Sequence, residues 1–119
     1  MTRETRTTDF ARAFSEALGL PRTARQIIDI LARTKDRLAV GEIVRRVQSS
    51  ERSVRENLAL LVRRGILDRQ VFVTANKKLA YVYSLRPVAD LIAAARGDLA
   101  RTLDRIERVA RRLRETTRA

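Results

Sequence analysis

The sequence predicts a mainly α-helical fold that carries one small β-hairpin. Two observations support this fold class. Aliphatic residues recur at helical spacing through most of the 119 residues, and between residues 66 and 85 the pattern changes to alternation. The length suits one domain with a single modest core.

The first predicted helix is short and apolar on one face. Phe10, Phe14 and Leu18 recur every four residues, and Thr7 or Thr8 is placed to cap the helix. A glycine and a proline then end it. We expect this N-terminal element, residues 1–20, to pack on a dimer, with Phe10 and Phe14 at the contact.

The next segments predict a helix-turn-helix unit. Amphipathic helices are expected over residues 21–34 and 40–47, joined by a polar connection at 35–38. Only Gln48-Ser49-Ser50 separates the second of these from another amphipathic helix, and two helices joined by so short a turn must cross steeply. Ser49 or Ser50 can cap the new helix, and Gly65 is expected to end it in a left-handed conformation.

A β-hairpin follows the helix-turn-helix unit. Residues 66–74 and 79–85 alternate and are rich in Val, Tyr and Phe, with a basic tip at 75–78 between them. Helix, helix, turn, helix and hairpin in this order make a winged helix-turn-helix domain, which we place at residues 21–86.

The last helix is predicted from residue 88 to about 114, and it is too long for an average globular helix. Apolar residues recur along it in a partial heptad that weakens near Arg96, and a stripe of this length implies a partner helix. Residues 87–119 are therefore expected to form a coiled-coil dimerisation helix. We call its apolar stripe the heptad seam: Ile92, Leu99, Leu103, Ile106, Ala110 and Leu113.

Composition indicates a polyanionic partner. The 26 basic and 14 acidic side chains leave a net charge of +12, with a pI near 11.6, which favours nucleic acid. With no Cys and no His, we expect no enzyme, no metal site and no cofactor. No apolar run is long enough to span a bilayer. We therefore expect a cytoplasmic, nucleoid-associated protein with no membrane partner.

The distribution of charge tests the nucleic-acid interpretation. Residues 45–78 hold nine basic and three acidic side chains, a net charge of +6, whereas residues 1–20 hold three of each. Half of the excess charge therefore lies in the predicted recognition helix and wing. This concentration favours double-stranded DNA as the partner.

The exposed stripe of the helix after the turn is the expected DNA-reading face. Arg52 and Arg55 are the expected base readers, because Arg binds guanine O6 and N7 bidentately. Ser53 can contact a phosphate or a base edge, and Glu56 can accept from cytosine or hold Arg52 in position. Further contacts to the DNA backbone are expected from Ser50, Arg63, Arg69, Asn76, Lys77 and Lys78.

The sequence also resembles a known family. VGEIVRRVQSSERSVRENLALLVRRGIL followed by YVYSL is similar to the DNA-binding domain of archaeal TrmB-like regulators and their MarR-type relatives, over residues 22–85. The resemblance implies a homodimer that places two recognition helices in successive major grooves, with wings on the flanking backbone or minor groove. The sugar-sensing domain of TrmB has no counterpart in these residues, so a compact form without an effector domain is expected, and any small-molecule effector is unknown.

Three other functions fit parts of the pattern. The leading interpretation, a sequence-specific transcriptional regulator, predicts a palindromic site with half-sites about one helical turn (~10 bp) apart. An architectural, chromatin-coating protein fits the arginine excess of the long helix. An RNA-binding winged helix is another alternative, and the heptad-bearing helix favours a DNA-binding dimer over it. A protein-interaction module is the last alternative, and it requires the basic stripe to be incidental.

Overall fold

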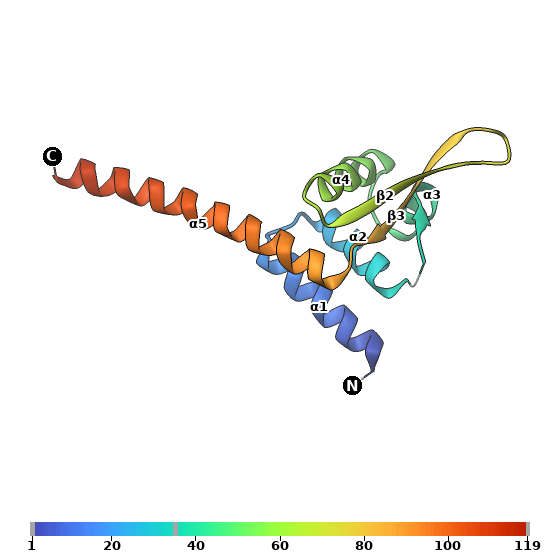
Figure 1. Cartoon of the computed structure of the whole chain (residues 1–119), viewed down its shortest axis with the longest axis horizontal. Coiled ribbons are helices and arrows are strands. Elements are labelled where there is room, and N and C mark those ends of the chain that lie inside the picture. The colour runs from blue at the N-terminus through green and yellow to red at the C-terminus, as the bar shows by residue number, and fades with distance from the viewer. Residues whose placement is uncertain (1, 35, 119) are drawn as a thin grey trace.

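The computed structural model describes residues 2–34 and 36–118 and has a mainly helical fold with a small antiparallel sheet. Its long axis measures 68 Å because one helix, α5, extends far beyond the rest (Figure 1). The arrangement is compatible with a winged helix. The elements in chain order are α1 (Arg3–Ala17), α2 (Arg22–Arg33), β1 (Leu38–Ala39), α3 (Val40–Arg46), α4 (Glu51–Arg63), β2 (Leu67–Val73), β3 (Leu79–Leu85) and α5 (Val88–Arg118).

The first helix begins earlier than predicted. Its N-cap is Thr2, whose hydroxyl accepts a hydrogen bond of 3.2 Å from the Thr5 backbone amide. Thr7, which we predicted as a cap, lies inside the helix and donates its hydroxyl to the Arg3 carbonyl. The predicted cap at Thr7 or Thr8 is therefore wrong, because the helix is already capped one and a half turns upstream.

The core lies between α1, α2, α4 and the sheet. Ile27 and Ile28 of α2 are fully buried, as are Leu58 and Leu61 of α4. The Phe10 and Phe14 rings stack at 5.8 Å between centroids, and Phe14 is buried within the chain itself. Phe14 therefore contributes to the core of its own chain. The core also includes Ala11, Leu20, Ala24, Leu31, Leu38, Ile43, Val47, Val54, Ile66, Leu67, Tyr83 and Leu91.

Three strands form the sheet, in the order β1-β3-β2, and all pairs are antiparallel. The predicted hairpin pairs Leu67 with Leu85 and Val73 with Leu79. The short β1 was not predicted. Its Leu38, in the segment expected to be a polar connection, pairs with Tyr83, and Lys35 of that segment lies outside the described residues. A strand of two residues is too short to show a period.

The turn between α3 and α4 is built as predicted. Ser50 is the N-cap of α4, and its hydroxyl accepts a 3.1 Å hydrogen bond from the Ser53 amide. Gly65 follows the helix with φ of +75°, a backbone conformation that glycine adopts without steric cost. Both ends of α4 are thus fixed by local chemistry.

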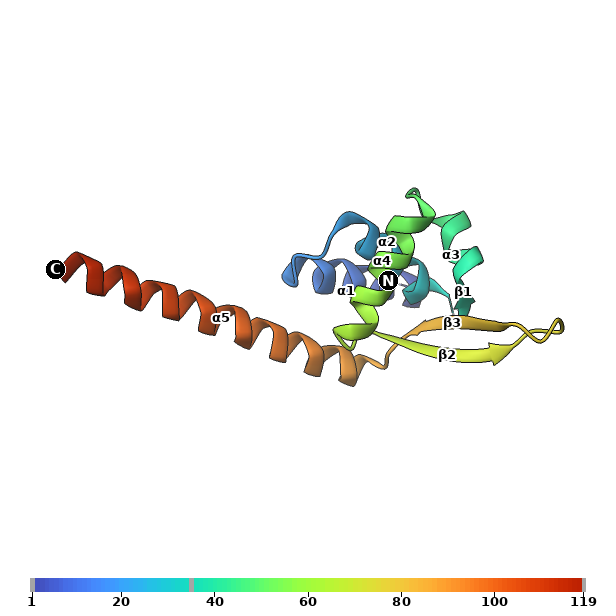
Figure 2. The same cartoon turned by 90° about the horizontal axis from the view of Figure 1, so that it is seen from above.

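The final helix is attached to the domain only near its start. Leu91 is buried in the core, and Asp98 forms an ion pair with Arg64 of the α4 C-cap. Beyond Asp98 the described residues as far as 117 are exposed, apart from the half-buried Ala110, and the ribbon runs free of the domain in both views (Figure 2). None of the described helices has the length and apolar character that a bilayer span requires.

Candidate nucleic-acid interface

The exposed face of α4 is predominantly charged. Val54, Leu58 and Leu61 pack into the core, so the side chains on the opposite side of the helix face outward. Those side chains belong to Glu51, Arg52, Arg55, Glu56, Ala59 and Arg63. The helical pattern therefore places four of the predicted DNA-contacting residues, Arg52, Arg55, Glu56 and Arg63, on one surface.

Two ion pairs hold the arginines on this face. Arg52 Nε lies 3.1 Å from Glu56 Oε1, and Arg55 Nη2 lies 3.0 Å from Glu51 Oε1. Each pair joins residues four apart, and all four side chains are at least 60% exposed. Exposed pairs of this kind contribute only about 0.3–0.5 kcal/mol. The carboxylates therefore orient the guanidinium groups without locking them.

Ser53 faces the protein. Its hydroxyl donates to Thr23 Oγ1 at 3.3 Å, and its carbonyl accepts from Asn57 at 2.8 Å. Thr23 of α2 also shares a 2.8 Å hydrogen bond with Ser49. These bonds tie α2 to the α3–α4 turn, and they occupy the hydroxyl that we expected to reach DNA. The donor hydrogen of the Ser53 hydroxyl is therefore used within the chain.

The hairpin tip presents two lysines. Thr74 and Lys78 close it through a 2.9 Å backbone hydrogen bond, and the Thr74 hydroxyl accepts from the Lys78 amide. Lys77 has φ of +59°, a conformation usually occupied by glycine. Asn76, Lys77 and Lys78 are all exposed. The predicted basic tip thus lies at the far end of the hairpin.

The outer half of the hairpin is also apolar, which the sequence interpretation missed. Five large hydrophobic side chains there are between 41% and 73% exposed: Val71, Phe72, Val73, Leu79 and Tyr81. Alternation predicted that these residues form strands, but not that the strands reach beyond the core. The signal available in the sequence was strand length, because a hairpin of two seven-residue strands extends further than one small core can cover.

Arg69 lies along the same hairpin. Its guanidinium carbon is 4.6 Å from the centre of the Tyr81 ring, a cation–π contact that holds the side chain against the strand. Tyr83, two residues further along β3, is buried. Tyr83 therefore packs in the core, whereas Tyr81 contacts the exposed guanidinium group of Arg69.

Helix α4 and the hairpin tip lie on the same side of the molecule. Figure 1 shows α4 and the tip of the β2–β3 hairpin along one edge, with α1 on the other. Arg63 lies at the end of α4 nearest the start of β2. One extended partner can therefore touch both elements at once.

The residues of the heptad seam are exposed in the single chain. Exposure rises from 39% at Ile92 to 67% at Leu113, and Ala110 is half-buried. Val109 beside the seam is also exposed. Their own chain leaves most of these side chains largely uncovered, so the apolar stripe remains available to a partner.

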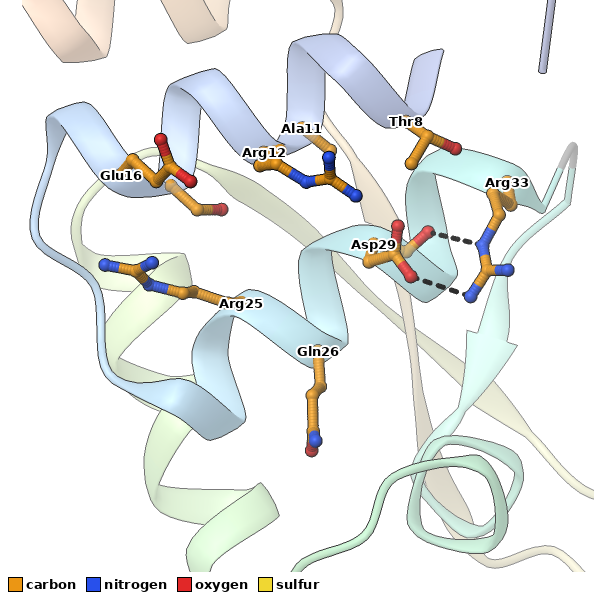
Figure 3. A pocket seen from close by; sticks show the side chains of 9 residues that line it. Thr8, Ala11, Arg12, Glu16, Arg25, Gln26, Asp29 and Arg33 are labelled. Atoms are coloured by element: carbon orange, nitrogen blue, oxygen red, sulfur yellow. Dashed lines mark hydrogen bonds and ion pairs between the residues drawn. The ribbon is translucent and has the colours of Figure 1, made fainter. Parts of the chain in front are cut away.

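A separate groove lies between α1 and α2. It has a volume of about 530 Å³, and Arg12, Glu16 and Arg25 border it in Figure 3. At one end Asp29 forms a 2.7 Å ion pair with Arg33. Its charges are mixed, and among the described residues there is no group of three or more His, Cys, Asp or Glu side chains able to hold a metal ion.

Comparison with known proteins supports the fold. No protein-family model and no curated protein sequence matches the chain. Among solved structures, the chain is similar to a possible transcriptional regulator from Methanosarcina mazei Go1, with a TM-score of 0.69 and 12% sequence identity. The match covers 85% of each chain. At this identity the similarity is one of fold.

Proposed function

We propose that the chain is a homodimeric, sequence-specific DNA-binding regulator of the compact winged helix-turn-helix type. The observation that supports this most directly is the exposed charged face of α4. It carries Arg52, Arg55 and Arg63 on a helix capped at both ends and packed on its opposite side. The fold shared with a possible transcriptional regulator agrees with the proposal.

Base reading is assigned to the N-terminal half of α4. Arg52 and Arg55 exchange their weak bonds to Glu56 and Glu51 for guanine edges in the major groove. The two carboxylates keep the guanidinium groups extended before binding, and they disfavour binding to phosphate alone. Ser50 and Arg63, at the two ends of the helix, contact phosphates.

The hairpin is assigned to the flanking backbone and minor groove. Asn76, Lys77 and Lys78 at its tip contact phosphates, and Arg69 does so from its base. The exposed Val73 and Leu79 pack on deoxyribose rings, which are the apolar part of the groove wall. This assignment gives the uncovered apolar half of the hairpin a partner.

Dimerisation is assigned to the heptad seam. Its apolar residues are spaced as in a coiled coil and are exposed in the single chain, so a second copy of the same helix provides the matching surface. Phe14 is buried in its own chain and is left out of this contact. Phe10, which is half-buried, remains a candidate at its edge.

An architectural role is the second candidate, and one observation favours it. The outer face of α5 carries Arg101, Arg105, Arg108 and Arg112, all exposed. Such a surface can hold DNA without reading it. The two functions differ in whether the base sequence of the DNA changes the affinity of the protein for it.

Selection of bound sequences from a random duplex pool distinguishes the two candidates. A regulator enriches a two-fold symmetric site, and Arg52→Ala or Arg55→Ala abolishes the enrichment. An architectural protein enriches no sequence, and its affinity follows only DNA length and salt. Absence of DNA binding at low salt would contradict both.

A further inference from the structure

Two residues along the heptad pattern of α5 bear on the orientation of its partner. In a heptad the stripe alternates between a and d positions. The d positions are taken by Ile92, Leu99, Ile106 and Leu113, and the a positions by Arg96, Leu103 and Ala110. Arg96 introduces a charge, and Ala110 leaves a space. In a symmetric pair, orientation decides which residues of the second copy meet them.

We propose that two copies of α5 pair antiparallel, with Leu103 of each copy opposite Ile106 of the other. The inference rests on the dimer proposed above and adds its geometry. Arg96 is exposed and makes no hydrogen bond or ion pair with other described residues. Its surroundings in the dimer therefore come from the second copy.

A parallel pair matches these residues poorly. Each a position then meets the same residue of the second copy, so Arg96 faces Arg96 and Ala110 faces Ala110. Two guanidinium groups at one layer repel each other within a desolvated seam. Two alanines at another layer leave a cavity, which costs stability in proportion to its volume.

An antiparallel pair removes both defects. In the proposed register Leu99 lies opposite Ala110, so a large side chain meets a small one in two layers. Arg96 lies opposite Leu113, where its methylene stem covers the leucine and its charged end reaches water. The remaining layers join Leu103 to Ile106 and, at each end, Ile92 to Thr117.

The charge along α5 favours the same orientation. Residues 88–103 contain two basic and two acidic side chains, whereas residues 104–118 contain six basic and three acidic, a net charge of +3. A parallel pair places the two positive halves side by side. An antiparallel pair places each positive half beside a neutral one, which lowers the repulsion.

This orientation separates the two DNA-binding domains. In the proposed register the two α5 N-termini are roughly 33 residues apart, which is about 50 Å along the axis at 1.5 Å per residue. Figure 1 shows the hairpin on the far side of the α5 N-terminus from the C-terminus, so the wings lie further apart still. The sequence predicted half-sites one helical turn apart, ~34 Å, which is shorter than this distance. The antiparallel dimer therefore predicts DNA half-sites that are spaced more widely.

Cysteine cross-linking tests the orientation directly, because the natural chain has no Cys. Ile92→Cys and Thr117→Cys chains of different mass are mixed, allowed to exchange and oxidised. We expect a disulfide-linked heterodimer of the two variants and no Ile92→Cys homodimer, because a disulfide needs Cα atoms within about 7 Å. Arg101→Cys, on the outer face, serves as the matched control and should form no cross-link with either.

Two outcomes overturn the inference, and each has its own meaning. Efficient cross-linking of Ile92→Cys to itself shows a parallel dimer, which leaves the proposed DNA-binding function intact. A chain that sediments as a monomer removes the proposed dimer as well. DNA binding by the unmodified chain is measured separately. Absence of that binding identifies failure of the proposed function itself.

A spin-label measurement avoids changes in the seam. Glu115 is exposed and lies outside the seam, so a nitroxide on Glu115→Cys should leave packing undisturbed. The antiparallel register separates the two labels by roughly 30 Å along the axis, given the helical rise. A parallel dimer instead leaves no axial separation. In a parallel dimer the distance between the two nitroxides would be set by the width of the coil alone, about 20 Å for two helices of roughly 10 Å diameter. A distance distribution centred there would contradict the inference.

Discussion

At the scale of single residues, the ion pairs of Arg52 with Glu56 and of Arg55 with Glu51 orient the proposed reading side chains and contribute little to stability. Each carboxylate orients one guanidinium group at about 3 Å. Because the pairs are exposed, breaking them costs the fold little. Substitutions at this face should therefore change DNA binding far more than folding.

Replacing Arg55 with alanine tests this expectation. Arg55→Ala should weaken binding to a selected site by about 1–3 kcal/mol, the value of a bidentate base contact, and should change the unfolding free energy by less than ~0.5 kcal/mol. Titration of labelled duplex measures the first quantity, and denaturant unfolding the second. Arg108→Ala is the control, because Arg108 is also exposed and paired to an acid four residues away. An equal loss in both variants would remove Arg55 from the reading face.

The N-cap of α4 gives a second test at this scale. Ser50→Ala removes the bond from the Ser53 amide and should lower the unfolding free energy by about 1 kcal/mol. Ser50→Asp also caps the helix, so stability should be retained while the new negative charge weakens DNA binding. Unchanged DNA affinity in Ser50→Asp would place that end of α4 away from the phosphates.

At the scale of elements, the hairpin combines a charged tip with an apolar body. Lys77 is held with φ of +59°, which favours glycine. Lys77→Gly should therefore keep or raise the unfolding free energy. If Lys77 contacts a phosphate, the slope of log affinity against log salt should fall by about one. An unchanged slope would remove Lys77 from the interface.

The apolar half of the hairpin is tested separately. Val73 and Leu79 face each other across the two strands and are mostly exposed, so Val73→Ser with Leu79→Ser should hardly affect folding. Loss of packing on the sugars should weaken DNA binding by about 1–2 kcal/mol for the pair. The salt slope should stay constant, since no charge changes. If affinity is unchanged but the oligomeric state differs, the surface binds a second copy instead.

The elements also show what sequence can and cannot predict. The turn at Ser50, the end at Gly65 and the strand Leu79–Leu85 carry strong local signals, and the structure has all three. β1 lacked such a signal because two residues show no period. The inward turn of Ser53 depends on Thr23, which lies 30 residues away in the chain, so no local pattern could reveal it.

At the scale of the whole molecule, a compact domain is joined to a protruding helix, and the fold of the domain does not require the outer half of that helix. The domain buries its own core, and the described residues of α5 beyond Asp98 are nearly all exposed. Leu103→Asp should therefore leave the domain folded and separate the dimer, because it places a charge in the central layers of the seam. Sedimentation should show a monomer with an unchanged near-ultraviolet spectrum of the core tyrosine, and DNA affinity should fall. A dimer that survives would place the contact outside the heptad seam.

The free half of α5 has a consequence for control by protein abundance. If the chain dimerises through the heptad seam as proposed, a dilute chain remains folded as a monomer with a single α4 face, because the core does not depend on that half. The bivalent form accumulates only when the concentration approaches the dimer dissociation constant. Two linked α4 faces would then bind DNA with a large effective concentration. Synthesis and dilution at cell division would thus switch occupancy of the DNA without any small-molecule signal.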